Sequence, residues 1–170
     1  MALIKSLNNL HPVIAPDVFL ADNATIIGDV SIAKGSSVWF HSTIRGDVNS
    51  IIIGNNVNIQ DGVVVHCTYQ KTNTVIGNNV SIGHNAIIHG CKIEDNVLIG
   101  MGAIIMDGAL IQKNSIVAAG SIVTKNTLVP SGSVFAGLPA KLIRTISEEE
   151  IYDLTQNMAD NYIKYSSWYL

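Results

Sequence analysis

The segment from residue 93 to residue 135, IEDNVLIGMGAIIMDGALIQKNSIVAAGSIVTKNTLVPSGSVF, carries an aliphatic or aromatic side chain at every sixth position. These positions are Ile93, Ile99, Ile105, Ile111, Val117, Val123, Val129 and Phe135. A small or branched residue, such as Ala103 or Ser115, follows four positions after each of the first seven. A period of six fits neither the 3.6-residue helical repeat nor plain alternation. It therefore predicts short strands, joined by turns, that stack into a parallel β-helix.

The same period extends towards the N-terminus and is interrupted at three places. Its earlier members are Ile14, Leu20, Ile26, Ile32, Val38, Ile44, Ile53, Ile59, Val65, Ile76, Ile82 and Ile88. Three extra residues separate Ile44 from Ile53, five separate Val65 from Ile76, and one is missing between Ile88 and Ile93. With three repeats to a coil, each coil buries its apolar side chains only against its neighbours. We expect an all-β fold over residues 1–146.

The repeat ends after Phe135, and a helical pattern follows. Ser147 and Glu150 form a capping box, which Ile146 and Ile151 complete as a hydrophobic staple. Apolar residues then recur at helical spacing at Ile151, Leu154, Met158, Tyr162 and Tyr165. We predict one helix over residues 148–165 that lies along the solenoid. Residues 147–170 thus form a C-terminal helical segment of the same single domain.

Composition excludes several classes of protein. Hydrophobic residues make up 48% of the 170 residues and charged residues 14%, which is too apolar for a disordered chain. The net charge of −3 argues against a nucleic acid partner. No stretch predicts a membrane span or a signal peptide, and two cysteines make no disulfide scaffold. We expect a cytoplasmic protein.

The repeat assigns positions to the histidines. His66 and His89 each follow a repeat position, Val65 and Ile88, that lie three repeats apart. The two side chains therefore share one face, one coil apart, and Arg45 falls on the same face one coil earlier. Imidazoles about 4.8 Å apart can tilt to the separation of about 3.3 Å that a tetrahedral zinc ion requires. The column predicts a metal site.

A third histidine, His84, has a different position in the repeat. It stands two positions after Ile82, on another face, directly one coil beyond Asp61 and its neighbour Gln60. The same chain does not readily bring His84 to the other two histidines, whereas a neighbouring solenoid packed side by side can. His11 and His41 show no such registry and are interpreted as ordinary surface or core histidines.

These residues together resemble the gamma-class carbonic anhydrase family. The resemblance is carried, in order, by Arg45-Gly46-Asp47, Gln60-Asp61-Gly62, His66, and His84 with His89. It implies a left-handed, three-sided β-helix and a homotrimer with metal sites between subunits. His66 and His89 would come from one chain and His84 from its neighbour. The metal would be zinc, with iron or cobalt as alternatives.

The resemblance also implies roles for further residues. Arg45 and Asp61 match an ion pair across the interface, and Asp47 matches another interface carboxylate. Gln60 matches a residue that hydrogen-bonds the metal-bound water, and Tyr162 matches a tyrosine of the C-terminal helix that reaches the site or packs on the helix face. No organic cofactor is implied.

The implied reaction is the attack of metal-bound hydroxide on carbon dioxide to give bicarbonate, the reaction of a zinc-dependent lyase. The chain departs from the family in two places. Val48 stands where a glutamate follows the Arg-Gly-Asp positions, and the insertion at residues 67–74 has no carboxylate to carry protons. Metal binding is therefore better supported than fast hydration.

Other functions fit parts of the same pattern. The segment Ala136–Lys141 resembles one that hexapeptide-repeat acyltransferases carry where the chain leaves the solenoid. A coenzyme A thioesterase and a catalytically weak, metal-binding trimeric accessory protein are the remaining hypotheses. Gly54, Gly77, Gly83, Gly100 and Gly102 are interpreted as corner residues rather than as phosphate-binding loops.

Overall fold

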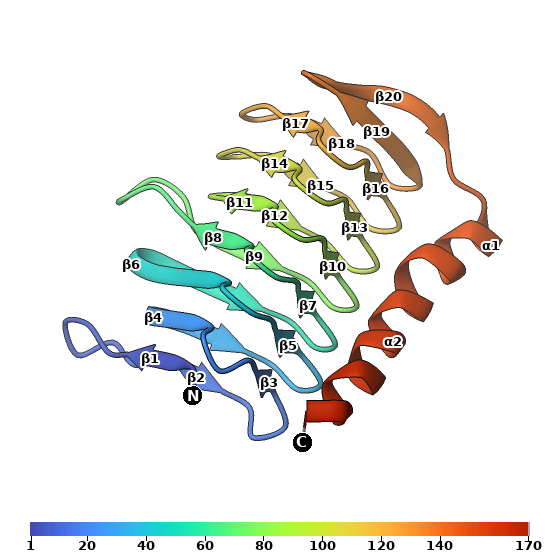
Figure 1. Ribbon diagram of the computed structural model, residues 1–170. Helices are drawn as coiled ribbons and strands as arrows, with labels where there is room; N and C mark the ends of the chain where they lie inside the picture. Colours follow the sequence, from blue (N-terminus) through green and yellow to red (C-terminus); the bar gives the residue numbers. More distant parts are fainter. Residues whose placement is uncertain (170) are drawn as a thin grey trace.

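The computed structural model describes residues 1–169 and consists of a three-faced solenoid of parallel strands with one helical segment beside it (Figure 1). The predicted fold class, a parallel β-helix with a single C-terminal helix, is confirmed. None of the described helices is long and apolar enough to cross a membrane.

Each face consists of strands stacked one coil apart. The first face holds β3 (Phe19–Leu20), β5 (Ser37–Val38), β7 (Asn58–Ile59), β10 (Ser81–Ile82), β13 (Leu98–Ile99), β16 (Ile116–Val117), β19 (Ser133–Gly137) and β20 (Ala140–Thr145). The second holds β1 (Leu3–Lys5), β8 (Val64–His66), β11 (Ile87–His89), β14 (Ile104–Ile105) and β17 (Ile122–Val123). The third holds β2 (Val13–Ile14), β9 (Thr74–Ile76), β12 (Lys92–Ile93), β15 (Leu110–Ile111) and β18 (Leu128–Val129).

Two long strands, β4 (Thr25–Ile32) and β6 (Thr43–Ile53), bend from the second face into the third and join these faces into one sheet. All pairings between coils are parallel, and only β20 runs antiparallel, against β19. The repeat positions fill the interior: Ile26, Ile44, Ile88, Ile99 and Ile105 are all 0% exposed. Their apolar burial is the main stabilising contribution of the fold.

All three interruptions of the repeat lie at one corner, in consecutive coils. The extra residues of β6, the loop between β8 and β9, and the shortened turn between β11 and β12 each connect the second face to the third. We name this edge, which includes Asp47, residues 67–73, His89 and Asp107, the site corner. The stacked core absorbs the changes in length because they fall outside the strand pairs that build it.

The corner from the third face to the first is regular and carries a column of asparagines. Asn56, Asn79, Asn96 and Asn114 all adopt left-handed φ values, from 53° to 59°. Each of the first three donates an amide hydrogen bond to the next, with distances of 3.1 to 3.2 Å. Asparagine tolerates this conformation better than most residues. We name this edge the asparagine corner.

Gly102 is a corner residue, as predicted, and its φ of +67° marks a tight turn. At Gly83 and Gly100 the physical reason is different. A Cβ on Gly83 would lie 2.6 Å from the Met101 nitrogen, and one on Gly100 would lie 2.3 Å from the Ala119 nitrogen. Close approach of the next coil, rather than φ, excludes a side chain at these two positions.

The C-terminal segment lies along the first face (Figure 1). It comprises α1 (Glu148–Ile151), a π-helical turn η1 (Tyr152–Gln156), α2 (Asn157–Ser166) and a 3-10 turn η2 (Ser167–Tyr169). The predicted capping box of Ser147 and Glu150 is present. The predicted helix therefore forms, but it contains a π turn that the apolar spacing did not reveal. Tyr162 packs edge-on against Trp39, with ring centroids 5.4 Å apart.

Candidate metal centre

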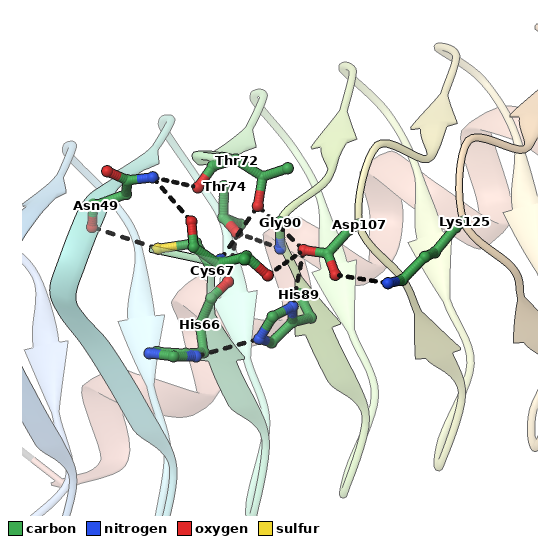
Figure 2. A network of polar contacts seen from close by, with 10 residues as sticks. Asn49, His66, Cys67, Thr72, Thr74, His89, Gly90, Asp107 and Lys125 are labelled. Carbon is green, nitrogen blue, oxygen red and sulfur yellow. Dashed lines mark hydrogen bonds and ion pairs between the residues drawn. The ribbon is translucent and has the colours of Figure 1, made fainter. Parts of the chain in front are cut away.

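His66 and His89 face each other across adjacent coils at the site corner (Figure 2). Strands β8 and β11 pair in register, so that His66 lies directly opposite His89, as the repeat predicted. Arg45 falls on the same face because β6 pairs with β8 through Ile44 and Val65. The His66 Nδ1 and the His89 Nε2 are 3.1 Å apart.

A carboxylate holds the other nitrogen of each ring. His66 Nε2 lies 2.9 Å from Asp47 Oδ1, and His89 Nδ1 lies 3.0 Å from Asp107 Oδ1. If each carboxylate accepts an N–H, the two nitrogens that face each other both present lone pairs. Two lone pairs at this distance repel unless a cation lies between them. The separation is close to the roughly 3.3 Å between nitrogens that bind one tetrahedral metal ion, so these residues fit a metal.

Asp47 is itself held by Arg45, whose guanidinium Nη1 lies 2.5 Å from Asp47 Oδ2. Burial acts to raise the pKa of Asp47, but the hydrogen bond from His66 and the charge of Arg45 outweigh it. The pKa of Asp47 is therefore lowered and the carboxylate is charged at neutral pH. Within one chain, the partner of Arg45 is Asp47 rather than Asp61.

Asp107 is the residue that the sequence analysis missed. It stands two positions after Ile105, one coil beyond His89 at the same corner. The repeat therefore already indicated where Asp107 lies in the fold. Burial acts to raise its pKa, but hydrogen bonds from Thr68, Thr72 and His89 together lower it. The sequence assigned a role in the site only to Asp47 and Asp61, which match positions of the family resemblance, and Asp107 matches no such position.

His84 lies at the remaining corner, between the first and second faces. Its Nδ1 is 2.8 Å from Asp61 Oδ2, so its Nε2 is the nitrogen left for a ligand role. The side chain of His84 is 40% exposed. The registry of His84 with Asp61 agrees with the repeat, since β7 and β10 pair in parallel.

Gln60 and Tyr162 line a cavity beside His84. The cavity, of about 450 Å³, lies between α2 and the first face, and apolar residues such as Ile99 and Val117 make up much of its wall. Gln60 is 4% exposed and uses an amide N–H to bond Asn58 Oδ1, which leaves its amide oxygen as an acceptor.

Tyr162 stays protonated over a wide range of pH. Burial, together with the charge of Asp61, raises the pKa of Tyr162 to about 12. Its hydroxyl is therefore neutral in this cavity at neutral pH. The tyrosine both packs on the helix face, through Trp39, and lies beside the residues of the His84 corner.

The three histidines do not meet in one chain. Among residues 1–169, no group of three or more His, Cys, Asp or Glu side chains converges as a metal site. The structure instead places His66 with His89 at one corner and His84 near Gln60 at another. By contrast, His11 pairs with Ser6 and His41 with Asn23, and neither contact involves a carboxylate. A carboxylate on each of the other three rings separates them from these two.

Fold and repeat define a hexapeptide-repeat solenoid with carboxylate-supported histidines at two corners. A family model described as bacterial transferase hexapeptide (six repeats) matches residues 73–106, and one described as hexapeptide repeat of succinyl-transferase matches residues 90–125. Among solved structures, a hexapeptide transferase family protein from Anaplasma phagocytophilum is 44% identical, with a TM-score of 0.94 over 99% of this chain and 98% of its own.

The names of curated relatives point to a narrower family than the repeat models do. "Gamma carbonic anhydrase 2, mitochondrial" of Arabidopsis thaliana is 49% identical over 89% of this chain, which spans 56% of that protein's length. "Probable carbonic anhydrase" of Methanocaldococcus jannaschii is 50% identical over 90% of this chain and 95% of its own length. The chain belongs to the gamma carbonic anhydrase-like family.

Proposed function

We propose that the protein is a carbonic anhydrase that hydrates carbon dioxide to bicarbonate at a metal held by His66, His89 and the His84 of a neighbouring subunit. One observation carries the proposal: carboxylates hold the outer nitrogens of His66 and His89, so that the inner nitrogens face each other 3.1 Å apart. The names of these two relatives support the same activity.

The proposed assembly is a homotrimer. Each chain carries His66 with His89 at one corner and His84 at another, so one copy can complete the site of the next by rotation about a threefold axis. Arg45, which is 43% exposed, is available to extend its interaction from Asp47 to the neighbour's Asp61. The carbon dioxide and bicarbonate of the reaction are the small-molecule partners.

The metal we propose is zinc, with ferrous iron or cobalt as alternatives, because neutral imidazoles suit all three ions. When bound, the ion supplies the Lewis acidity that makes water a nucleophile near neutral pH. Asp47, Asp61 and Asp107 each accept a hydrogen bond from one nitrogen of a neutral ring, which leaves the lone pair of the other nitrogen for the metal. Gln60 accepts a hydrogen bond through its amide oxygen and orients the attacking water.

We expect slow turnover. Residues 67–74 and Val48 supply no carboxylate, and Asp107 beside the loop is engaged by the hydroxyls of Thr68 and Thr72. Protons therefore leave the site without a dedicated carrier. The expected outcome is full metal loading with a hydration rate well below that of family members whose corresponding loop contains carboxylates.

The test is stopped-flow hydration of carbon dioxide on anaerobically purified protein, with metal content measured on the same sample. His89→Ala should lose the metal and the activity, while His41→Ala, the matched control, should lose neither. Equal metal content in His89→Ala and the parent protein would reject His89 as a ligand. For the assembly, Arg45→Ala should shift the trimer towards monomer in light scattering at low concentration, and an unchanged mass would argue against the ion pair.

Hydrolysis of a coenzyme A thioester is the second candidate. The observation in its favour is the apolar cavity beside His84 and Gln60, which at about 450 Å³ is far larger than carbon dioxide requires. An acyltransferase would use the same cavity without a metal. Metal-loaded protein that hydrates no carbon dioxide but cleaves acyl-coenzyme A would favour the thioesterase, and metal-free transfer to an acceptor would favour the acyltransferase. Inactivity in all three assays, namely hydration, thioester cleavage and acyl transfer, would indicate an accessory role.

A further inference from the structure

One oxygen of Asp107 collects three hydrogen-bond donors from two parts of the chain. The Thr72 hydroxyl and the His89 Nδ1 each lie 3.0 Å from Asp107 Oδ1 (Figure 2). The Thr68 hydroxyl lies at the same distance from this oxygen. On the other side, Lys125 Nζ lies 4.0 Å from Asp107 Oδ2. A single carboxylate therefore connects the loop of residues 67–73 to one of the proposed metal ligands.

The backbone at the site corner is built to let this carboxylate approach. Gly90, directly after His89, has a φ of +57°. A Cβ at this position would lie 2.1 Å from Asp107 Oδ1 and 2.3 Å from the Thr72 hydroxyl oxygen. Asp107 and Thr72 occupy the space that any side chain at position 90 would need.

The loop is held from its other side as well. The Asn49 amide donates to the backbone oxygens of Thr68 and Thr72, at 3.0 and 2.9 Å. Thr68 and Thr72 are thus fixed through their backbone by Asn49 and through their hydroxyls by Asp107. These contacts fix both ends of the loop relative to His89.

We propose that Asp107 is a positioning residue that keeps the proton of neutral His89 on Nδ1, presents its Nε2 as a metal ligand, and couples this ligand to the loop of residues 67–73. The inference rests on the proposed metal site. Without Asp107, a proton on His89 Nε2 would gain a hydrogen bond to His66 Nδ1, 3.1 Å away, and would block the ligand nitrogen.

The first experiment measures the tautomer of His89 in metal-free protein by ¹⁵N NMR near pH 9, where imidazoles are neutral. The parent protein should carry the proton on Nδ1, and Asp107→Ala should move it to Nε2. Asp107→Asn should retain part of the Nδ1 form, because its amide oxygen still accepts one hydrogen bond. The same tautomer in the parent and in Asp107→Ala would overturn the proposal.

The second experiment measures Co²⁺ affinity by competition with a chelator and follows the visible spectrum of the bound ion. Loss of a carboxylate behind a ligating histidine commonly weakens metal binding 10- to 100-fold, and we expect that loss for Asp107→Ala. The matched control is Asp95→Asn, which removes a corner carboxylate that accepts hydrogen bonds from Asn78 and contacts no histidine. Its affinity should be unchanged.

The loop is tested separately with the double variant Thr68→Val and Thr72→Val, which leaves the bond between Asp107 and His89 in place. Hydrogen exchange of the loop amides should rise while the His89 tautomer stays on Nδ1. If Asp107→Ala fails to fold, Asp107→Asn still tests the tautomer, and the double variant still tests the coupling to the loop. A parent protein that binds no Co²⁺ would refute the proposed function, whereas equal affinity of the parent and Asp107→Ala would refute only the role of Asp107.

Discussion

Two corners of the same solenoid differ in how the chain turns: one repeats the same turn in each coil, and the other does not. At the asparagine corner, one residue type repeats in register, and each side chain bonds its copy in the next coil. At the site corner, three consecutive coils turn differently: β6 bends, residues 67–73 form a loop, and the turn after His89 is shortened. The comparison teaches that regular turns stabilise the stack, while irregular turns bring unlike residues together, as chemistry requires.

The largest expected effect comes from Gly90→Ala at the site corner. The new Cβ meets Asp107 and Thr72 at 2.1 and 2.3 Å and also requires a left-handed φ. We expect a loss of about 2–4 kcal/mol in the free energy of unfolding, measured by urea denaturation, together with lost metal binding.

Gly120→Ala is the matched control, because Gly120 has a φ of +67° but nothing within 4 Å of its Cβ position. It should lose only about 1 kcal/mol, the cost of the left-handed conformation. Equal losses for the two variants would show that Asp107 and Thr72 move aside easily, and would remove the steric basis of the contrast between the corners.

The asparagine corner is tested with two substitutions of Asn79, whose amide donates to Asn96 and whose oxygen accepts from Asn56. Asn79→Ala should cost about 2 kcal/mol through lost hydrogen bonds and a strained φ of +53°. Asn79→Gly removes only the hydrogen bonds and should cost about half as much. Metal content should be unaltered in both. A change in metal content would mean that the corners are not independent.

The smallest effect concerns the helix, which touches neither corner. The hydrogen bond and ion pair with Arg144, together with the Ser147 backbone N–H, lower the pKa of Glu150 to about 2. Because the pKa is lower in the folded chain, this contribution to stability is present above pH 4.5 and is lost as the pH falls towards 2. An NMR titration of the Glu150 carboxylate should find this midpoint; a midpoint near 4.5 would mean that the pair does not form in solution.

Sequence reasoning went furthest where the repeat fixes geometry. The period alone placed His66 opposite His89 and His84 beyond Asp61, and the strand pairing confirms both. It went less far in the helix, because a π turn changes hydrogen bonding without disturbing the apolar spacing. Which subunit supplies each histidine stays a prediction, since it depends on the packing of separate chains.

Asp107 shows where the sequence stopped. Residues 67–74 contain no carboxylate, and the sequence pattern pointed to no carboxylate elsewhere in the chain that contacts this loop. The fold supplies one from the next coil, since Asp107 is 39 positions from Thr68 along the chain yet bonds its hydroxyl. Hydrogen-bond partners of this kind depend on rotamers and loop conformation, which a hexapeptide period does not encode.

The sequence by itself determined the solenoid, the face of each repeat position and the column of His66 and His89, because a buried side chain at every sixth position marks the same point on each successive face. Only the tertiary structure decided which nitrogens face each other and which carboxylates hold them. It also decided why Gly90 has no side chain. The physical reason is range: burial acts on every repeat alike, whereas a hydrogen bond depends on a few tenths of an ångström between residues that are distant in sequence.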